Sequence, residues 1–145
     1  CSLMNYSDKL LFDILSKVSV IAIVGASSSL HKPSYKLMKY LQEKSYKIIP
    51  INPKYAGQKI LGERVFPSLS ECNTKIDMID IFREKEQITD VAKEAVKNSK
   101  RLGISVFWMQ LGLINDEARI IAQKSGMTVI MNRCPKIEIC RLNKE

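Results

Sequence analysis

The chain has 145 residues, of which 46% are hydrophobic and 26% are charged, as in a globular protein of one domain. No apolar run reaches about 18 residues, so we expect no membrane partner. The formal net charge of +8 fits either a basic solvated surface or an anionic partner, such as a phosphorylated small molecule or a nucleic acid.

The cysteines, Cys1, Cys72, Cys134 and Cys140, form no C-x-x-C pair, and the single histidine cannot complete a zinc site at these spacings. A chain with this apolar content needs no disulfide, so we expect no metal, free thiols and a cytoplasmic location. Charged residues interrupt the opening segment where a signal peptide would be apolar. The chain begins at Cys1 and not at Met, which leaves a targeting segment upstream open.

A helix, a strand and a second helix are expected first. Ser7 is a good N-cap for a helix within residues 1–17. Val18–Val24 is a nearly continuous β-branched run, which is typical of a strand buried on both faces, and Gly25 ends it. Pro33 suits the first turn of a helix that runs to Lys44.

A second strand at Lys47–Ile51 leads into an irregular stretch. Pro50 in this strand requires a place near its end or at an unpaired edge of the sheet. The segment Lys54–Asn73 is expected to be a long excursion with one short strand at Arg64–Phe66.

The second half of the chain alternates between strands and helices. We expect strands at Ile76–Phe82, Ile104–Trp108 and Met127–Met131, and helices at Glu86–Lys100, after the N-cap Asn115, and from Pro135. Strands separated by helices form right-handed parallel crossovers. The sequence therefore predicts one doubly wound, Rossmann-like α/β domain over residues 1–145, with five mainly parallel strands and helices on both faces.

The segment between the first strand and its helix is suited to phosphate. Gly25 and Ala26 let the backbone approach a ligand, and Ser27–Ser29 offer hydroxyl groups. The following helix presents backbone N–H groups, and Lys32 and Lys36 add positive charge. Folds of this class bind ligands beyond the carboxyl ends of their strands, so we predict a phosphate site here.

The residues around this loop bear on the kind of nucleotide. A dinucleotide fingerprint needs G-x-G-x-x-G and an acidic residue about twenty positions on. Only Gly25 is present, and the second strand ends in Asn52, Pro53 and Lys54 without a carboxylate. A carboxylate would repel a ribose phosphate, whereas Asn52 and Lys54 would accept one. This argues against NAD and leaves NADP and coenzyme A open.

Five blocks of sequence carry a family resemblance: IAIVGASSSLHKPSYKLMKYL, IIPINPKYAGQKILGERVFPSL, IDMIDIFR, VFWMQLGLINDEA and MNRCPKIE. In this order, from about residue 18 to residue 141, the chain resembles the stand-alone CoA-binding domain proteins, which are similar to the CoA-binding domain of the succinyl-CoA synthetase α subunit. The resemblance implies binding of coenzyme A or an acyl-CoA. The binding residues that it implies are Gly25, Ala26, Ser27, Ser28, Lys32, Pro33, Ser34, Asn52, Pro53, Lys54, Phe82, Arg83 and Gln110.

The resemblance also implies a role for each part of this site. Residues 25–27 would face the pyrophosphate, and Lys32 would pair with a phosphate as a point charge. Phe82 and Arg83 would contact the pantetheine or adenine side, and Gln110 would line the far wall.

No catalytic set can be assembled from the sequence. His31 lies in the phosphate loop and is interpreted as a binding or bystander residue, since the phosphorylated histidine of the synthetases belongs to another domain. Cys134 stands beside Arg133 at a predicted helix start, which leaves a reactive thiol and a buried cap residue open. Asp77 and Asp80 fall on opposite faces of a strand and are interpreted as structural.

Two functions therefore stay open. One is a binding module without chemistry of its own, acting as a carrier, sensor or regulator. The other is an enzyme, an NADP-type oxidoreductase or a CoA-dependent transferase, that uses the same nucleotide site. The lysines are spread over several helices and no nucleic-acid module signature occurs, so no nucleic-acid partner is expected.

Overall fold

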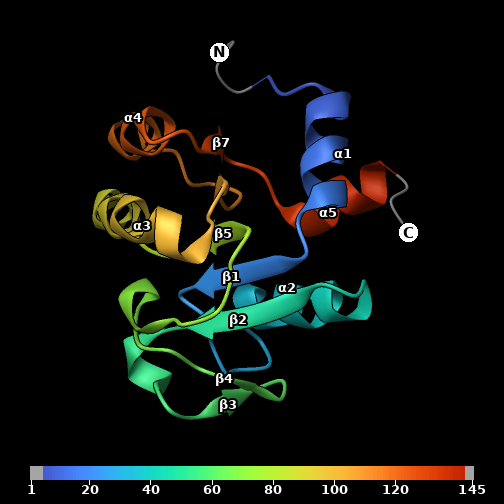
Figure 1. Ribbon diagram of the computed structural model, residues 1–145. Helices are drawn as coiled ribbons and strands as arrows, with labels where there is room; N and C mark the ends of the chain where they lie inside the picture. The colour runs from blue at the N-terminus through green and yellow to red at the C-terminus, as the bar shows by residue number, and fades with distance from the viewer. Residues whose placement is uncertain (1–4, 143–145) are drawn as a thin grey trace.

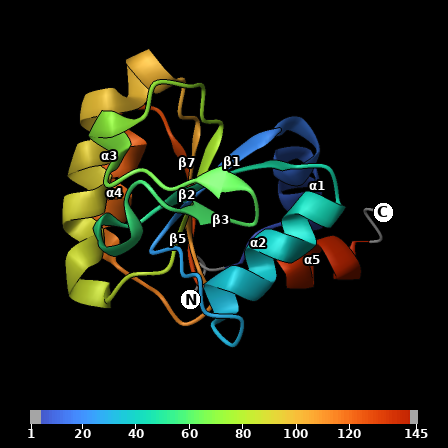
Figure 2. The ribbon, with the colours of Figure 1, turned by 90° about the horizontal axis from the view of Figure 1, so that it is seen from below.

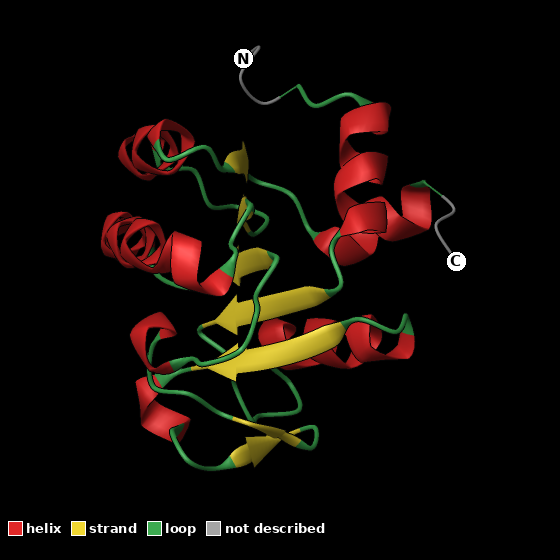
Figure 3. Ribbon diagram, viewed as in Figure 1, coloured by secondary structure: helices red, strands yellow, loops and turns green. Residues whose placement is uncertain are grey.

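The computed structural model describes residues 5–142, so the expected free thiol of Cys1 lies outside the described residues. Its centre is a five-stranded sheet in the order β2-β1-β5-β6-β7, with every neighbouring pair parallel (Figures 1 and 3). This confirms the predicted doubly wound fold. The strands are β1 (Val20–Val24), β2 (Lys47–Ile51), β5 (Met78–Ile81), β6 (Val106–Met109) and β7 (Thr128–Ile130).

Helices cover both faces of the sheet, as Figures 1 and 2 show. One face packs against α3 (Ile88–Leu102) and α4 (Asp116–Lys124). The other packs against α1 (Asp8–Lys17), α2 (Pro33–Glu43) and α5 (Pro135–Arg141). Each face has its own apolar cluster, which explains why most residues of the strands are apolar on both faces. None of the helices described in residues 5–142 has the length and apolar character needed to cross a membrane.

The chain leaves the sheet between β2 and β5. It forms the 3-10 turn η2 (Pro53–Tyr55), a hairpin of β3 (Lys59–Ile60) and β4 (Glu63–Arg64), and the 3-10 turn η3 (Leu69–Glu71). The single short strand expected at Arg64–Phe66 was wrong, because Arg64 ends β4 and Phe66 makes only an isolated bridge to Ile51. The strand β2 lies at the edge of the sheet, as its Pro50 requires.

Several predicted boundaries were wrong by one or two residues, because end residues bond outside the sheet. Val18 is the C-cap of α1 and donates to the Ile14 carbonyl oxygen at 3.1 Å, so β1 begins at Val20. Ile104 donates to the Ser99 carbonyl oxygen at 3.1 Å, which leaves Val106 as the first residue of β6.

The start of α3 and both ends of β7 are shifted for similar reasons. Lys85–Gln87 form the 3-10 turn η4, closed by a capping box from Glu84, so α3 begins at Ile88 and not at Glu86. Met127 donates to the Ala122 carbonyl oxygen at 3.1 Å and Met131 donates to the Tyr6 hydroxyl at 2.9 Å, and β7 is shortened at both ends.

The strand order reverses at β1. From β1 the chain first adds β2 on one side and later adds β5 on the other. The carboxyl ends of β1 and β5 therefore diverge into different connections, which is where doubly wound sheets bind their ligands.

Candidate functional site

The loop that leaves β1 starts at a position that only glycine can occupy. Gly25 has φ +95°, and a Cβ placed there would lie 2.2 Å from the carbonyl oxygen of Phe82. The close approach is fixed because the Phe82 N–H donates to the Val24 carbonyl oxygen at 2.7 Å. Gly25 therefore brings the end of β5 directly against the loop.

The first amides of this loop are bonded within the protein. The N–H groups of Gly25 and Ala26 both donate to the Ile51 carbonyl oxygen, at 2.9 and 3.2 Å. Asn52 Nδ2 donates to the Ala26 carbonyl oxygen at 2.8 Å. These contacts shape the loop and engage the N–H groups of Gly25 and Ala26 within the protein.

The open donors lie at the start of α2. Lys32 is the N-cap and makes no side-chain cap hydrogen bond, and Pro33 follows it. The N–H of Lys36 makes the first bond of the helix ladder, to the Lys32 carbonyl oxygen at 3.2 Å. The N–H groups of Ser34 and Tyr35 precede that bond, and they stand at the positive end of the helix dipole.

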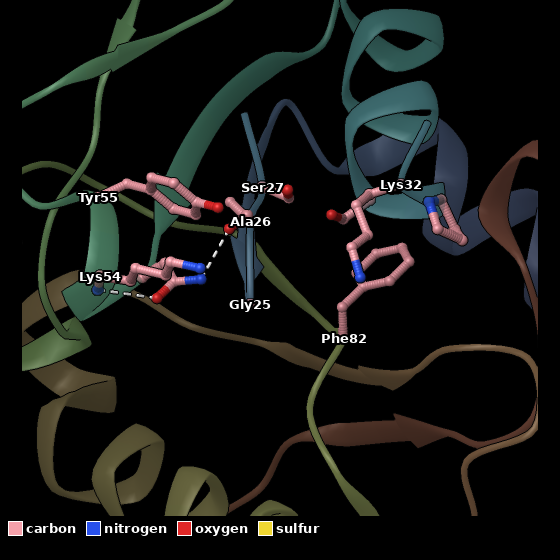
Figure 4. A pocket seen from close by; sticks show the side chains of 10 residues that line it. Gly25, Ala26, Ser27, Lys32, Lys54, Tyr55 and Phe82 are labelled. Carbon is pink, nitrogen blue, oxygen red and sulfur yellow. Dashed lines mark hydrogen bonds between the residues drawn. The ribbon is translucent and has the colours of Figure 1, made fainter. Parts of the chain in front are cut away.

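A cavity of about 320 Å³ opens between this helix start and the end of β2. Figure 4 shows Tyr55 and Lys54 on one side of it, Lys32 and Phe82 on the other, and the loop between them. Its lining comprises Gly25, Ala26, Ser27, Lys32, Pro33, Ser34, Asn52, Lys54, Tyr55 and Phe82. The fold thus brings together residues from three segments that the sequence had singled out.

The other predicted site residues lie around this cavity, outside its lining. Ser28 is exposed beside Ser27, and Pro53 opens η2. The Arg83 side chain lies against Gly25, and its Cδ would be 3.2 Å from a Cβ added at Gly25. Gln110 follows β6 and faces Asp80.

Tyr55 is a lining residue that the sequence reasoning missed. Asn52 caps η2 by accepting from the Lys54 N–H at 3.0 Å, and this turn carries Tyr55 over the loop. Hydrogen bonds with the hydroxyls of Ser27 and Ser28 lower the pKa of Tyr55, although burial acts in the opposite direction. The available signal was its place directly after Asn-Pro-Lys, a segment already assigned to the site.

The electrostatics of the cavity suit an anion. The described lining contains two ammonium groups, of Lys32 and Lys54, and no carboxylate. The Lys54 ammonium lies 5.4 Å from the centre of the Tyr55 ring. Cations beside uncapped backbone N–H groups form the environment that binds phosphate in proteins.

The remaining candidates from the sequence lie elsewhere. His31 is exposed and does not line the cavity. Cys134 is the half-buried N-cap of α5, and Asp77 accepts from the N–H groups of Ser19 and Val20 at 2.8 and 2.9 Å. Trp108 is fully buried. Within residues 5–142 no group of three or more metal-binding side chains occurs.

Comparison with known proteins identifies the family. A model described as a CoA binding domain matches residues 19–139. The chain is 36% identical to the Bacillus subtilis protein YneT, over 93% of this chain and 96% of that protein. It is 29% identical to an ADP-forming acetate–CoA ligase of Methanocaldococcus jannaschii, over 85% of this chain but only 18% of the ligase.

The fold agrees with these sequence relationships. A hypothetical protein from Pyrococcus horikoshii OT3 superimposes with a TM-score of 0.89 and 32% identity, and the match covers 97% of this chain and 95% of that one. The family match spans β1 through α5 and so includes the whole cavity. The chain belongs to the CoA-binding domain family.

Proposed function

We propose that this protein binds coenzyme A or an acyl-CoA in the cavity at the end of β1. The observation that carries the proposal is the start of α2, which has no side-chain cap and where Lys32 and Ser34 line the same cavity as Lys54. A diphosphate offers these donors several negatively charged oxygens. Membership of the CoA-binding domain family and the match to a CoA ligase support coenzyme A as the source of that diphosphate.

The end of β2 supports a ligand with a phosphate on its ribose. In dinucleotide sites an acidic residue near this strand end binds the ribose hydroxyls. Here the strand is followed by Asn52 and the cation Lys54, both in the cavity lining. An additional phosphate would be attracted by Lys54, whereas NAD would find no carboxylate for its ribose.

We further propose a carrier, sensor or regulatory role without chemistry at this site. The described lining supplies hydroxyl, amide, ammonium and phenol groups. These groups bind and orient an anion. The only imidazole, of His31, and the half-buried thiol of Cys134 lie outside the lining.

Calorimetric titration with four ligands tests the proposal. We expect CoA to bind, dephospho-CoA to bind more weakly, NADP to bind weakly and NAD not to bind. The difference between CoA and dephospho-CoA isolates the ribose phosphate, whereas CoA and NADP differ both in the arm and in the position of that phosphate, which is 3′ in CoA and 2′ in NADP. A preference for NAD, or no binding of any of the four, would refute the proposal. A preference for NADP would favour the oxidoreductase alternative.

A further inference from the structure

A carboxyl group is buried in the sheet beside the cavity, and within residues 5–142 it makes no ion pair. Asp80 lies in β5 and is 0% exposed, and its register partners are Ile23 on β1 and Trp108 on β6. Burial raises the pKa of Asp80 well above its ordinary value, although a hydrogen bond from the Ile81 N–H opposes this. Burying a carboxyl group among apolar side chains costs free energy. Such a group therefore calls for an explanation.

The side-chain partner of Asp80 is Gln110. With its amide nitrogen turned toward the carboxylate, Gln110 Nε2 lies 3.1 Å from Asp80 Oδ1 and 3.2 Å from Oδ2. A protonated Asp80 would instead donate its O–H to the Gln110 carbonyl oxygen, with the amide in the opposite orientation. In both protonation states one end of the amide is held by Asp80. When Asp80 is ionised the amide oxygen is the end directed away from it, and when Asp80 is protonated the amide nitrogen is.

The position of Gln110 relates it to the cavity. Ile81 and Met109 are register partners on neighbouring parallel strands, so Phe82 and Gln110 each follow at the same edge of the sheet. Neighbouring strands lie about 4.8 Å apart. Side chains alternate along a strand, which puts Asp80 and Phe82 on one face together with Trp108 and Gln110. Phe82 lines the cavity. Half-buried Gln110 follows the neighbouring strand β6 at the same edge of the sheet.

We propose that Asp80 is a positioning residue that holds the Gln110 amide as a second polar contact of the nucleotide site, for an amide-bearing arm attached to the diphosphate. This rests on the proposed function. An arm that leaves a diphosphate bound at the start of α2 and passes Phe82 would reach Gln110 next. An amide in that arm has both an N–H and a carbonyl group, so it can pair with whichever end of Gln110 is free.

Two ligands separate this contact from phosphate binding. Coenzyme A has an amide-containing arm, whereas adenosine 3′,5′-bisphosphate has the nucleotide end without the arm and without the second phosphate of the diphosphate. We expect Gln110→Met to weaken CoA binding by about fivefold, the worth of one net hydrogen bond, and to leave the bisphosphate unchanged. Gln123→Met makes the same change on the exposed surface of α4 and should affect neither ligand.

Variants of Asp80 distinguish positioning from a structural role. Asp80→Val removes a buried polar group, so it should preserve or raise the melting temperature while weakening CoA binding as much as Gln110→Met does. The double variant Asp80→Val, Gln110→Met should bind CoA no more weakly than either single variant, because both substitutions remove the same contact. Asp80→Asn can still bond the Gln110 amide and should retain most of the CoA affinity.

A spectroscopic readout covers the case in which Asp80→Val does not fold. In wild-type protein labelled with ¹⁵N, the NMR resonances of the Gln110 side-chain amide should change chemical shift on addition of CoA and not on addition of the bisphosphate. The role of Asp80 and Gln110 would be overturned if their substitutions changed the affinities for CoA and the bisphosphate equally, or changed neither. If the wild type binds neither ligand, the proposed function fails as well. If it binds both equally tightly, only this inference fails.

Discussion

Asn52 joins the two sides of the cavity. Its Nδ2 donates to the Ala26 carbonyl oxygen at 2.8 Å, and its Oδ1 accepts from the Lys54 N–H at 3.0 Å. One end of the amide therefore fixes the loop after β1, and the other end starts η2. Both ends are bonded within the protein, so Asn52 shapes the candidate site.

Two substitutions of Asn52 should separate these contacts. Asn52→Ala removes both hydrogen bonds and should lower the free energy of unfolding by about 1–2 kcal/mol. Asn52→Asp keeps an acceptor for Lys54 but adds a negative charge beside the phosphates, so it should weaken CoA binding more than Asn52→Ala does. Urea denaturation and calorimetry measure the two effects. Tight binding of CoA by Asn52→Asp would contradict this role.

The close contact at Gly25 predicts a large loss of stability. Gly25→Ala would place a methyl group against the Phe82 carbonyl oxygen and would also strain the positive φ, so it should cost about 3 kcal/mol or more. Gly57 has a similar φ of +84° with no atom within 4 Å. Gly57→Ala should therefore cost only about 1 kcal/mol. Comparable losses in urea denaturation of the two variants would show that the close contact is relieved by movement of β5.

The charge of Lys32 should matter for binding and not for folding. Lys32 is exposed at the start of α2, so Lys32→Glu should leave the melting temperature nearly unchanged while lowering CoA affinity by more than about tenfold. Lys93→Glu changes the net charge equally at an exposed position of α3, and this variant should retain CoA binding. Calorimetry at fixed ionic strength compares the two. Unchanged affinity in Lys32→Glu would mean that the phosphates bind elsewhere.

Asp77 and Asp80 should contribute to stability with opposite dependence on pH. Burial raises the pKa of Asp77, but the N–H groups of Ser19 and Val20 and the nearby Lys75 outweigh it, so the net pKa is lowered. Its contribution is present above the unfolded pKa of about 4 and is lost as pH falls through the lowered folded value. For Asp80 the folded pKa is raised by burial, so stability is lost as pH rises from about 4 through that value.

Asparagine substitutions test this contrast by urea denaturation from acidic to neutral pH. Relative to wild type, Asp80→Asn should become more stable as pH rises, because it removes the cost of ionising a buried carboxyl group. Asp77→Asn should be least stable relative to wild type at neutral pH and should approach it on acidification. Parallel pH profiles for the two variants would show that one of the environments is misassigned.

The pattern of residues along the chain is enough to predict the class of fold and the location of the candidate site. Runs such as Val20–Val24 are apolar because both faces of the sheet are covered. Gly25 and Pro33 mark element ends through their backbone conformation, and Asn115 does so through its side-chain cap. These are local properties, so they can be read along the chain. The loop proposed to bind phosphate could be located because it follows the first of these strands.

Only the tertiary structure decided how the polar groups around the site are used. The pairing of Asn52 with Ala26, and of Gln110 with Asp80, joins residues 26 and 30 positions apart along the chain. Such contacts depend on which strands are neighbours and on their register, and neither is encoded in any single segment. The same holds for the N–H groups of Gly25 and Ala26, whose acceptor on β2 becomes their neighbour only when β1 and β2 pair side by side.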